Sequence, residues 1–78
     1  MNRDDLRNRL PASGHRESSY SLDGYRDELT CLESRGQQWA VYYGERGQKI
    51  LTHLFPDEDS ACRYMLGVVT GNEDLNDR

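Results

Sequence analysis

The residues that most often act in catalysis are few in this chain and stand far apart. There are two histidines and two cysteines: His15, His53, Cys31 and Cys62. Nucleophilic catalysis needs a base within hydrogen-bond reach of the nucleophile and a third group that orients the base. Neither histidine has a serine, cysteine or aspartate at such a spacing, and a single pair of cysteines has no metal-ligand pattern. We therefore expect no enzymatic activity, no cofactor and no metal site.

Acidic and aromatic side chains offer a second kind of chemistry, the recognition of a charged partner. Carboxylates attract basic surfaces and speed encounter with them, and tyrosine is favoured at the energetic centre of protein interfaces. Tyr42 and Tyr43 are neighbours on a predicted strand, so one of them must point away from a covering helix. The sequence indicates these partner-binding residues: Tyr42, Glu45, Asp57, Glu58, Asp59 and Glu33.

The run Asp57-Glu58-Asp59 also has a structural interpretation. It precedes an apolar helical pattern, where Asp57 can cap the first turn and the next two acids favour the positive end of the helix dipole. The two interpretations are compatible, because a helix start needs only one cap residue. Five other acids could extend the negative field, namely Glu33, Glu45, Glu73, Asp74 and Asp77.

The charge of the chain is acidic and unevenly distributed. The net charge is −4. Residues 1–19 carry four Arg and three acids, a net of +1, whereas residues 20–78 carry six Lys or Arg and eleven acids, a net of −5. Binding to a phosphate backbone requires a basic stripe, which this chain does not have. The composition argues against nucleic acid and favours a basic protein partner.

Apolar residues are concentrated in the middle of the chain. Leu, Ile, Val and Phe make up 14 of 78 residues, under the roughly 20% below which disorder becomes common. However, 22 of the 27 apolar residues lie in a central stretch. We expect a weakly ordered arm over residues 1–18, a single domain over 19–71 and a polar, unstructured tail over 72–78. A short docked helix is the alternative for the arm, because Leu6 and Leu10 are four residues apart.

Turn signals at regular intervals predict an antiparallel meander. Asp23-Gly24 is typical of a hairpin turn, and Ser34–Gln37 and Glu45–Gln48 each predict a type I turn with a G1 bulge. These turns separate four predicted strands, at residues 19–22, 29–32, 39–43 and 49–55. In the last of these strands, alternation does not decide which face is buried.

A change of period after Phe55 predicts a C-terminal helix over residues 57–70. Apolar residues recur there at three-and-four spacing, and Gly71 is a typical helix stop. Gly67 inside the helix would permit close packing on a strand. The predicted fold is α+β, an antiparallel meander of three to four strands with the helix packed on one face. The other sheet face is left to solvent, to the N-terminal arm or to a partner.

The chain shows no export or membrane signal. Its N-terminus, MNRDDLRNRL, has charges where a signal peptide needs an apolar region. No apolar run approaches the roughly 18 residues of a membrane span. Small secreted domains usually carry a framework of several disulfides. We therefore expect a cytoplasmic protein with reduced thiols and no membrane partner.

Three segments of the chain resemble small bacterial immunity proteins, which are encoded beside secreted polymorphic or contact-dependent toxins. The segments are Tyr20–Gly24, Trp39–Gly47 and Phe55–Cys62. The resemblance implies a cytoplasmic inhibitor that binds its toxin domain tightly. Many such toxins are basic nucleases, and the resemblance implies that an acidic inhibitor blocks their substrate groove by imitating phosphate charge.

Two other functions fit parts of the sequence. A self-associating structural or regulatory module, such as a homodimer, would cover the sheet face that one helix leaves open. A small RNA-binding domain of the double-stranded-RNA type would share the order of a helix, three strands and a helix. The acidic balance and the lack of a basic cluster at the final helix argue against RNA.

Overall fold

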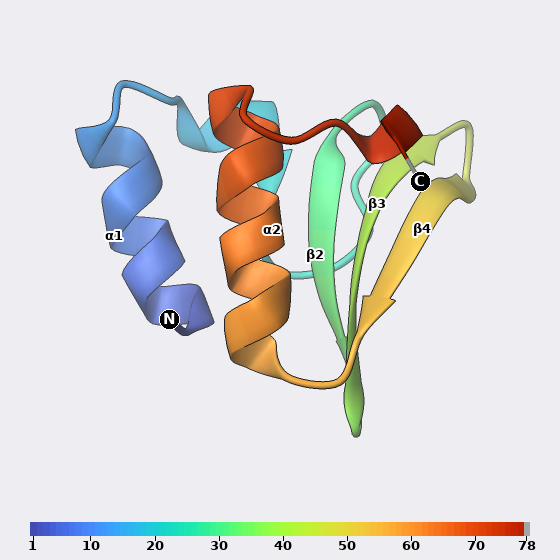
Figure 1. The fold of residues 1–78 in the computed structure, drawn as a ribbon. Helices are drawn as coiled ribbons and strands as arrows, with labels where there is room; N and C mark the ends of the chain where they lie inside the picture. The colour runs from blue at the N-terminus through green and yellow to red at the C-terminus, as the bar shows by residue number, and fades with distance from the viewer. Residues whose placement is uncertain (78) are drawn as a thin grey trace.

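The computed structural model describes residues 1–77 of the chain. In Figure 1 the second helix lies between the first helix and a twisted sheet, and it contacts both. The elements in chain order are α1 (Arg3–Ala12), η1 (Glu17–Ser19), β1 (Tyr20–Ser21), β2 (Thr30–Arg35), β3 (Gln38–Glu45), β4 (Gln48–Phe55), α2 (Glu58–Thr70) and η2 (Leu75–Asp77). The α+β class and the helix packed on the sheet are confirmed.

The sheet is mixed, not purely antiparallel. Its strand order is β1-β2-β3-β4, and β2, β3 and β4 form the antiparallel meander that was predicted. β1 pairs with β2 in parallel, so the hairpin predicted at Asp23-Gly24 is wrong. Parallel neighbours need a crossover, and residues 22–29 provide it. In this crossover the Gly24 N–H donates to the Leu32 carbonyl at 3.0 Å.

The crossover covers the sheet face that the sequence left open. Cys31, Ala40 and Tyr42 are fully buried on this outer face, and Tyr25 and Leu29 of the crossover pack against them. A buried side chain of this kind gains about 25 cal/mol for each Å² removed from water. The crossover therefore covers the outer face over β2 and β3, whereas β4 remains largely exposed.

Both hairpins have two-residue loops, so the predicted G1 bulges are wrong. Arg35 pairs with Gln38 across one loop, and Glu45 pairs with Gln48 across the other. In the second loop Arg46 and Gly47 have φ of 52° and 81°, as a type I′ turn requires. Such turns match the right-handed twist of the strands, which type I turns do not.

The C-terminal helix agrees with its prediction. Asp57 is the N-cap and accepts from the Ser60 N–H at 2.7 Å, and Gly71 ends the helix with a φ of 89°. Gly67 is needed for another reason than the one predicted. A Cβ at this position would lie 2.5 Å from Cγ of Glu73, so the close neighbour is the chain that leaves the helix, not a strand.

The two ends of the chain are better packed than the composition suggests. Residues 3–12 form the docked helix that was the alternative for the arm, with Leu6 and Leu10 fully buried and a capping box between Asn2 and Asp5. At the other end Leu75 is buried, so the prediction of an unstructured tail is wrong. Two leucines in α1 and one in η2 complete the core on the helix side of the sheet.

A bulge in β4 changes the register partway along the strand. Tyr43 pairs with Ile50, but Val41 pairs with His53, so β4 has one more residue than β3 in this interval. Leu51 lies in the bulge and has a left-handed φ of 55°. Simple alternation fails at this point, and for that reason the sequence did not decide which face of β4 is buried.

Beyond the bulge, alternate residues of β4 face α2. The rings of His53 and Phe55 each lie 5.2 Å from the ring of Tyr64. Leu54, between them, faces the other way and is 53% exposed. Within residues 1–77, neither helix has the length and apolar character needed to cross a bilayer.

Candidate functional site

A closed cluster of charged and aromatic groups lies on the outer face of the sheet. The carboxylate of Glu33 accepts from the Tyr42 hydroxyl at 2.8 Å, from Arg35 Nε at 2.9 Å and from Lys49 Nζ at 3.0 Å. Despite the burial that opposes ionisation, these hydrogen bonds and the nearby ammonium lower the pKa of Glu33 from 4.5 to about 2. We call these four residues the outer-face cluster.

Tyr42 belongs to this cluster and is not an exposed interface residue. It points away from α2, as predicted, but its exposed fraction is 0%. The Tyr25 ring stacks on it at 6.5 Å between centroids, and Lys49 Nζ lies 5.3 Å from its ring centre. Burial and the Glu33 carboxylate raise the pKa of the Tyr42 hydroxyl. No sequence pattern indicates that the crossover covers this ring.

Gly44 explains how the crossover comes so close to β3. A Cβ at this position would lie 2.3 Å from the Arg26 carbonyl oxygen. Two backbone hydrogen bonds form in the space that glycine leaves, from the Glu28 N–H to the Gly44 carbonyl and from the Gly44 N–H to the Leu29 carbonyl. Any larger residue would push the crossover, and with it the cover of Tyr42, off the sheet.

The acidic run at the start of α2 is used within the fold. Asp57 caps α2, and the Glu58 carboxylate accepts from the Arg3 N–H at the start of α1 at 2.7 Å. Asp59 contacts Arg63 Nε at 2.9 Å and the Met1 ammonium group. These contacts lower the pKa of Asp59. Asp57 therefore caps α2, and Glu58 and Asp59 join the starts of the two helices.

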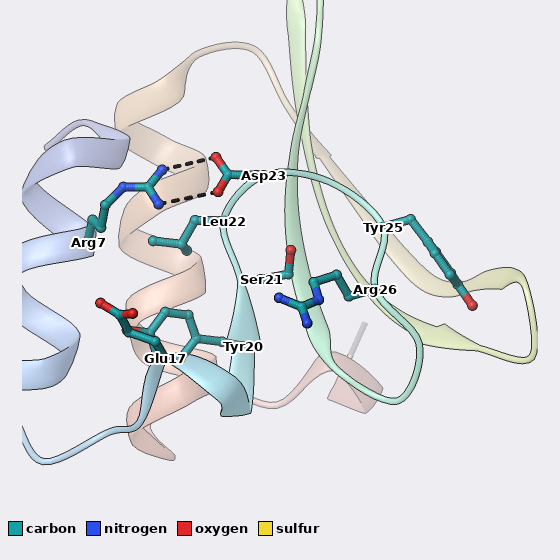
Figure 2. Close-up of a pocket in the computed structure, with 8 residues that line it drawn as sticks. All are labelled: Arg7, Glu17, Tyr20, Ser21, Leu22, Asp23, Tyr25 and Arg26. Carbon is teal, nitrogen blue, oxygen red and sulfur yellow. Dashed lines mark hydrogen bonds and ion pairs between the residues drawn. The ribbon is translucent and has the colours of Figure 1, made fainter.

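A cavity of about 380 Å³ lies between α1, η1 and the chain that follows β1. Figure 2 shows its two-pronged ion pair, in which Arg7 Nη1 and Nη2 donate to Asp23 at 3.3 and 3.0 Å. This pair lowers the pKa of Asp23 and raises that of Arg7. Glu17 and Arg26 stand on opposite sides of the same cavity (Figure 2). The two arginines and two carboxylates that line the cavity thus balance, and its net formal charge is zero.

The one buried polar atom without a partner in the described part of the chain is the Tyr20 hydroxyl. Burial and the nearby Glu17 carboxylate raise the pKa of this hydroxyl. Because the atom is enclosed by protein, it does not offer a hydrogen bond to a ligand in the cavity.

A second hollow, which we call the sheet-end cleft, has a different character. It holds about 360 Å³ and is lined by residues of β2, β3, β4, α2 and η2 and of the segment that joins α2 to η2. Figure 1 shows that segment crossing one end of the sheet. The Tyr43 ring, Leu51 and Val68 give it an apolar wall, and Glu73 and Asp74 give it an acidic one. No cation lines it among the residues that the structure describes.

Left-handed backbone is concentrated at this end of the sheet. Within residues 1–77, the non-glycine residues with positive φ are Glu28, Arg46 and Leu51. Glu28 bonds to Gly44, Arg46 is in the β3–β4 turn, and Leu51 lines the cleft. Such conformations cost of order 1 kcal/mol or more each and tend to be kept at functional sites. Leu51 is also 41% exposed, so it gains little from burial in return.

The structure separates the predicted partner-binding residues into three places. Glu33 and Tyr42 share the outer-face cluster, and Asp57, Glu58 and Asp59 share the helix starts. Glu45 belongs to neither group. It is exposed at the β3–β4 turn, near the sheet-end cleft. Leu51 and the cleft were not predicted, because a bulge and its exposed leucine leave no pattern in the sequence.

The chain offers little for metal or thiol chemistry. Residues 1–77 contain no group of three or more His, Cys, Asp or Glu side chains placed to share a metal ion. Both cysteines are buried and free. Burial raises the pKa of Cys62 to about 11 and also raises that of Cys31, so neither thiol is ionised at neutral pH.

Comparison with protein families, curated proteins and solved structures finds no match.

Proposed function

We propose that the protein is a small cytoplasmic inhibitor that binds a basic protein through the sheet-end cleft and the acidic residues around it. In this proposal the partner is a bacterial toxin domain, for example a nuclease, and the protein is its immunity protein. It would act by covering the toxin's active or substrate-binding surface.

The observation that carries the proposal is the state of Leu51. Its backbone is left-handed and its side chain is exposed, and both features lower the stability of the free protein. We take strain that the fold retains at an exposed apolar residue as support for a contact made outside the chain. An exposed apolar side chain surrounded by charged residues would give such a contact an apolar centre with a polar rim.

The charge around Leu51 indicates the kind of partner. Glu73 and Asp74 line the cleft, and Glu45 is exposed at the adjacent turn. None of the three takes part in an ion pair with another residue of the described chain. Arg46 in the same turn offsets only part of this charge. A basic surface would be attracted and oriented by these carboxylates.

The size of the domain is compatible with inhibition by coverage. The described chain exposes 4836 Å², and a standard interface takes about 800 Å² from each partner. A footprint of that size, centred on the cleft, would reach the β3–β4 turn and Glu45. Against a nuclease, the carboxylates would occupy the sites where substrate phosphates bind.

Site-specific photo-crosslinking tests this proposal. A photoreactive amino acid at position 51, expressed in the source cells, should capture one basic protein, and adding the purified wild-type chain should inhibit that protein's activity. The matched control is position 54, because Leu54 is exposed on the same strand but faces away from α2. Capture of a second copy of the chain, or equal capture from both positions, would overturn the proposal.

A further inference from the structure

We propose that the sheet-end cleft receives a single arginine side chain from the partner. This inference rests on the function proposed above and adds the chemical group that is recognised. The guanidinium would lie against Tyr43 and Leu51 and pair with the carboxylates of Glu73 and Asp74.

The dimensions of the cleft suit one side chain. Small-molecule sites begin at about 300 Å³, and the cleft holds about 360 Å³. It is large enough for one long side chain with its bound water. Tyr43 and Val68 are partly buried and pack against the core, so this wall is fixed before anything binds.

The acidic wall has acceptors available. One Asp74 carboxylate oxygen accepts from the Asn76 N–H at 2.9 Å, which holds the side chain in place. The Glu73 carboxylate makes no hydrogen bond or ion pair with any residue of the described chain. Its Cβ and Cγ lie close to Gly67, and the residue lines both the sheet-end cleft and the neighbouring hollow beside α1 and α2. Two adjacent carboxylates match the several donors of a guanidinium.

The chain already uses this combination twice for its own cations. Lys49 lies over the Tyr42 ring and pairs with Glu33, and the Arg3 guanidinium lies 5.4 Å from the centre of the Trp39 ring. In the cleft an aromatic ring and carboxylates are again close together, but the described chain contributes no cation. Within residues 1–77 the set lacks its cation, and in this proposal a partner supplies it.

Arginine fits this place better than lysine. A guanidinium is planar and weakly hydrated, so it stacks on a ring while it forms two parallel hydrogen bonds to carboxylates. An ammonium group is a compact and strongly hydrated charge, and it would lose more water in contact with Leu51 and Val68. Arginine is also among the residues that contribute most to binding at protein interfaces.

An NMR titration of the full chain tests the inference directly. The probes are three blocked pentapeptides, Gly-Gly-Xaa-Gly-Gly, in which the central residue is arginine, lysine or the neutral isostere citrulline. The arginine peptide should shift the methyl signals of Leu51 and Val68 and the ring signals of Tyr43. The citrulline peptide should bind at least about tenfold more weakly, as expected when a hydrogen bond loses its charge.

Two double variants separate the cleft from general acidity. The change Glu73→Gln/Asp74→Asn should weaken the arginine peptide at least about tenfold. The control Asp4→Asn/Glu17→Gln removes the same charge from α1 and η1 and should leave the affinity unchanged. Equal binding of citrulline, equal loss in both double variants, or shifts confined to other residues would overturn the inference. If the arginine peptide fails while position 51 still crosslinks to a basic protein, the proposed function survives and only the arginine site is wrong.

Discussion

Tyr42 and Tyr43 are neighbours in β3 and present the same kind of ring to opposite faces of the sheet. Tyr42 is buried beside a carboxylate, Glu33, and beneath a cation, Lys49, and both come from the chain itself. Tyr43 lines a cleft with two carboxylates and, within residues 1–77, no cation. The first arrangement is complete and supports the fold, whereas we propose that a group from a partner completes the second. A cluster of charged and aromatic groups is thus better evidence of function when one of its charges is missing.

The largest expected effect comes from opening the complete arrangement. Glu33→Ala leaves a buried hydroxyl and two cations without their shared acceptor, which should reduce the free energy of unfolding by about 3 kcal/mol. Urea unfolding at neutral pH measures the change. Glu73→Ala is the matched control and should change stability by less than about 0.5 kcal/mol, because that carboxylate is exposed and unpaired. Equal losses of stability in the two variants would mean that the outer-face cluster and the sheet-end cleft do not differ in their structural role.

The pH dependence of stability should come from the same carboxylate. The pKa of Glu33 is lowered in the folded state from 4.5 to about 2, so the unfolded chain binds more protons between these values. The stabilisation is fully present above pH 5 and is lost as the pH falls toward 2. We expect about 2 kcal/mol from this group, allowing for the water that reaches it. In acid unfolding, Glu33→Gln should lack this loss of stability between pH 5 and pH 2. A plot of its stability against pH that runs parallel to that of wild type would contradict the assignment of the loss to Glu33.

Substitution of the acids at the helix starts should change stability and not the rate of binding. Asp57→Ala removes the N-cap of α2 and should cost about 1 kcal/mol of stability. Since the carboxylate is used within the fold, the association rate with the captured partner should change little once the folded fraction is corrected. Stopped-flow mixing at low ionic strength provides the rate. A large decrease in that rate would return the helix start to the binding surface, as the sequence first suggested.

The smallest expected effect on stability has the opposite sign. Leu51→Gly relieves the left-handed backbone and removes an exposed side chain, so it should stabilise the protein by up to about 1 kcal/mol. The same change should weaken binding to the captured partner, because the apolar anchor is lost. Thermal unfolding and a binding titration of one sample test both statements. Lower stability with unchanged binding would mean that Leu51 has a structural role only.

The elements of this fold were more accessible from sequence than its site. Asp57 and Gly71 are a cap and a stop that sequence patterns report well, and α2 agrees with its prediction. The parallel pairing of β1 was not accessible, because Asp23-Gly24 is equally compatible with a crossover. Tyr42 lies on the outer face, as its place among the predicted partner-binding residues required. It is covered by Tyr25, which belongs to the crossover and not to a strand that pairs with β3. Local rules describe elements, and the exposure of a residue depends on what the rest of the chain places over it.

The most direct test of the account measures stability and binding in the same two variants. Glu33→Ala and Glu73→Gln/Asp74→Asn should give opposite results in urea unfolding and in titration with the arginine pentapeptide. We predict that the first loses about 3 kcal/mol of stability and, under conditions in which it is folded, binds the peptide like wild type. The second should keep its stability and lose the peptide. Loss of peptide binding in the first variant, or loss of stability without loss of binding in the second, would contradict the account.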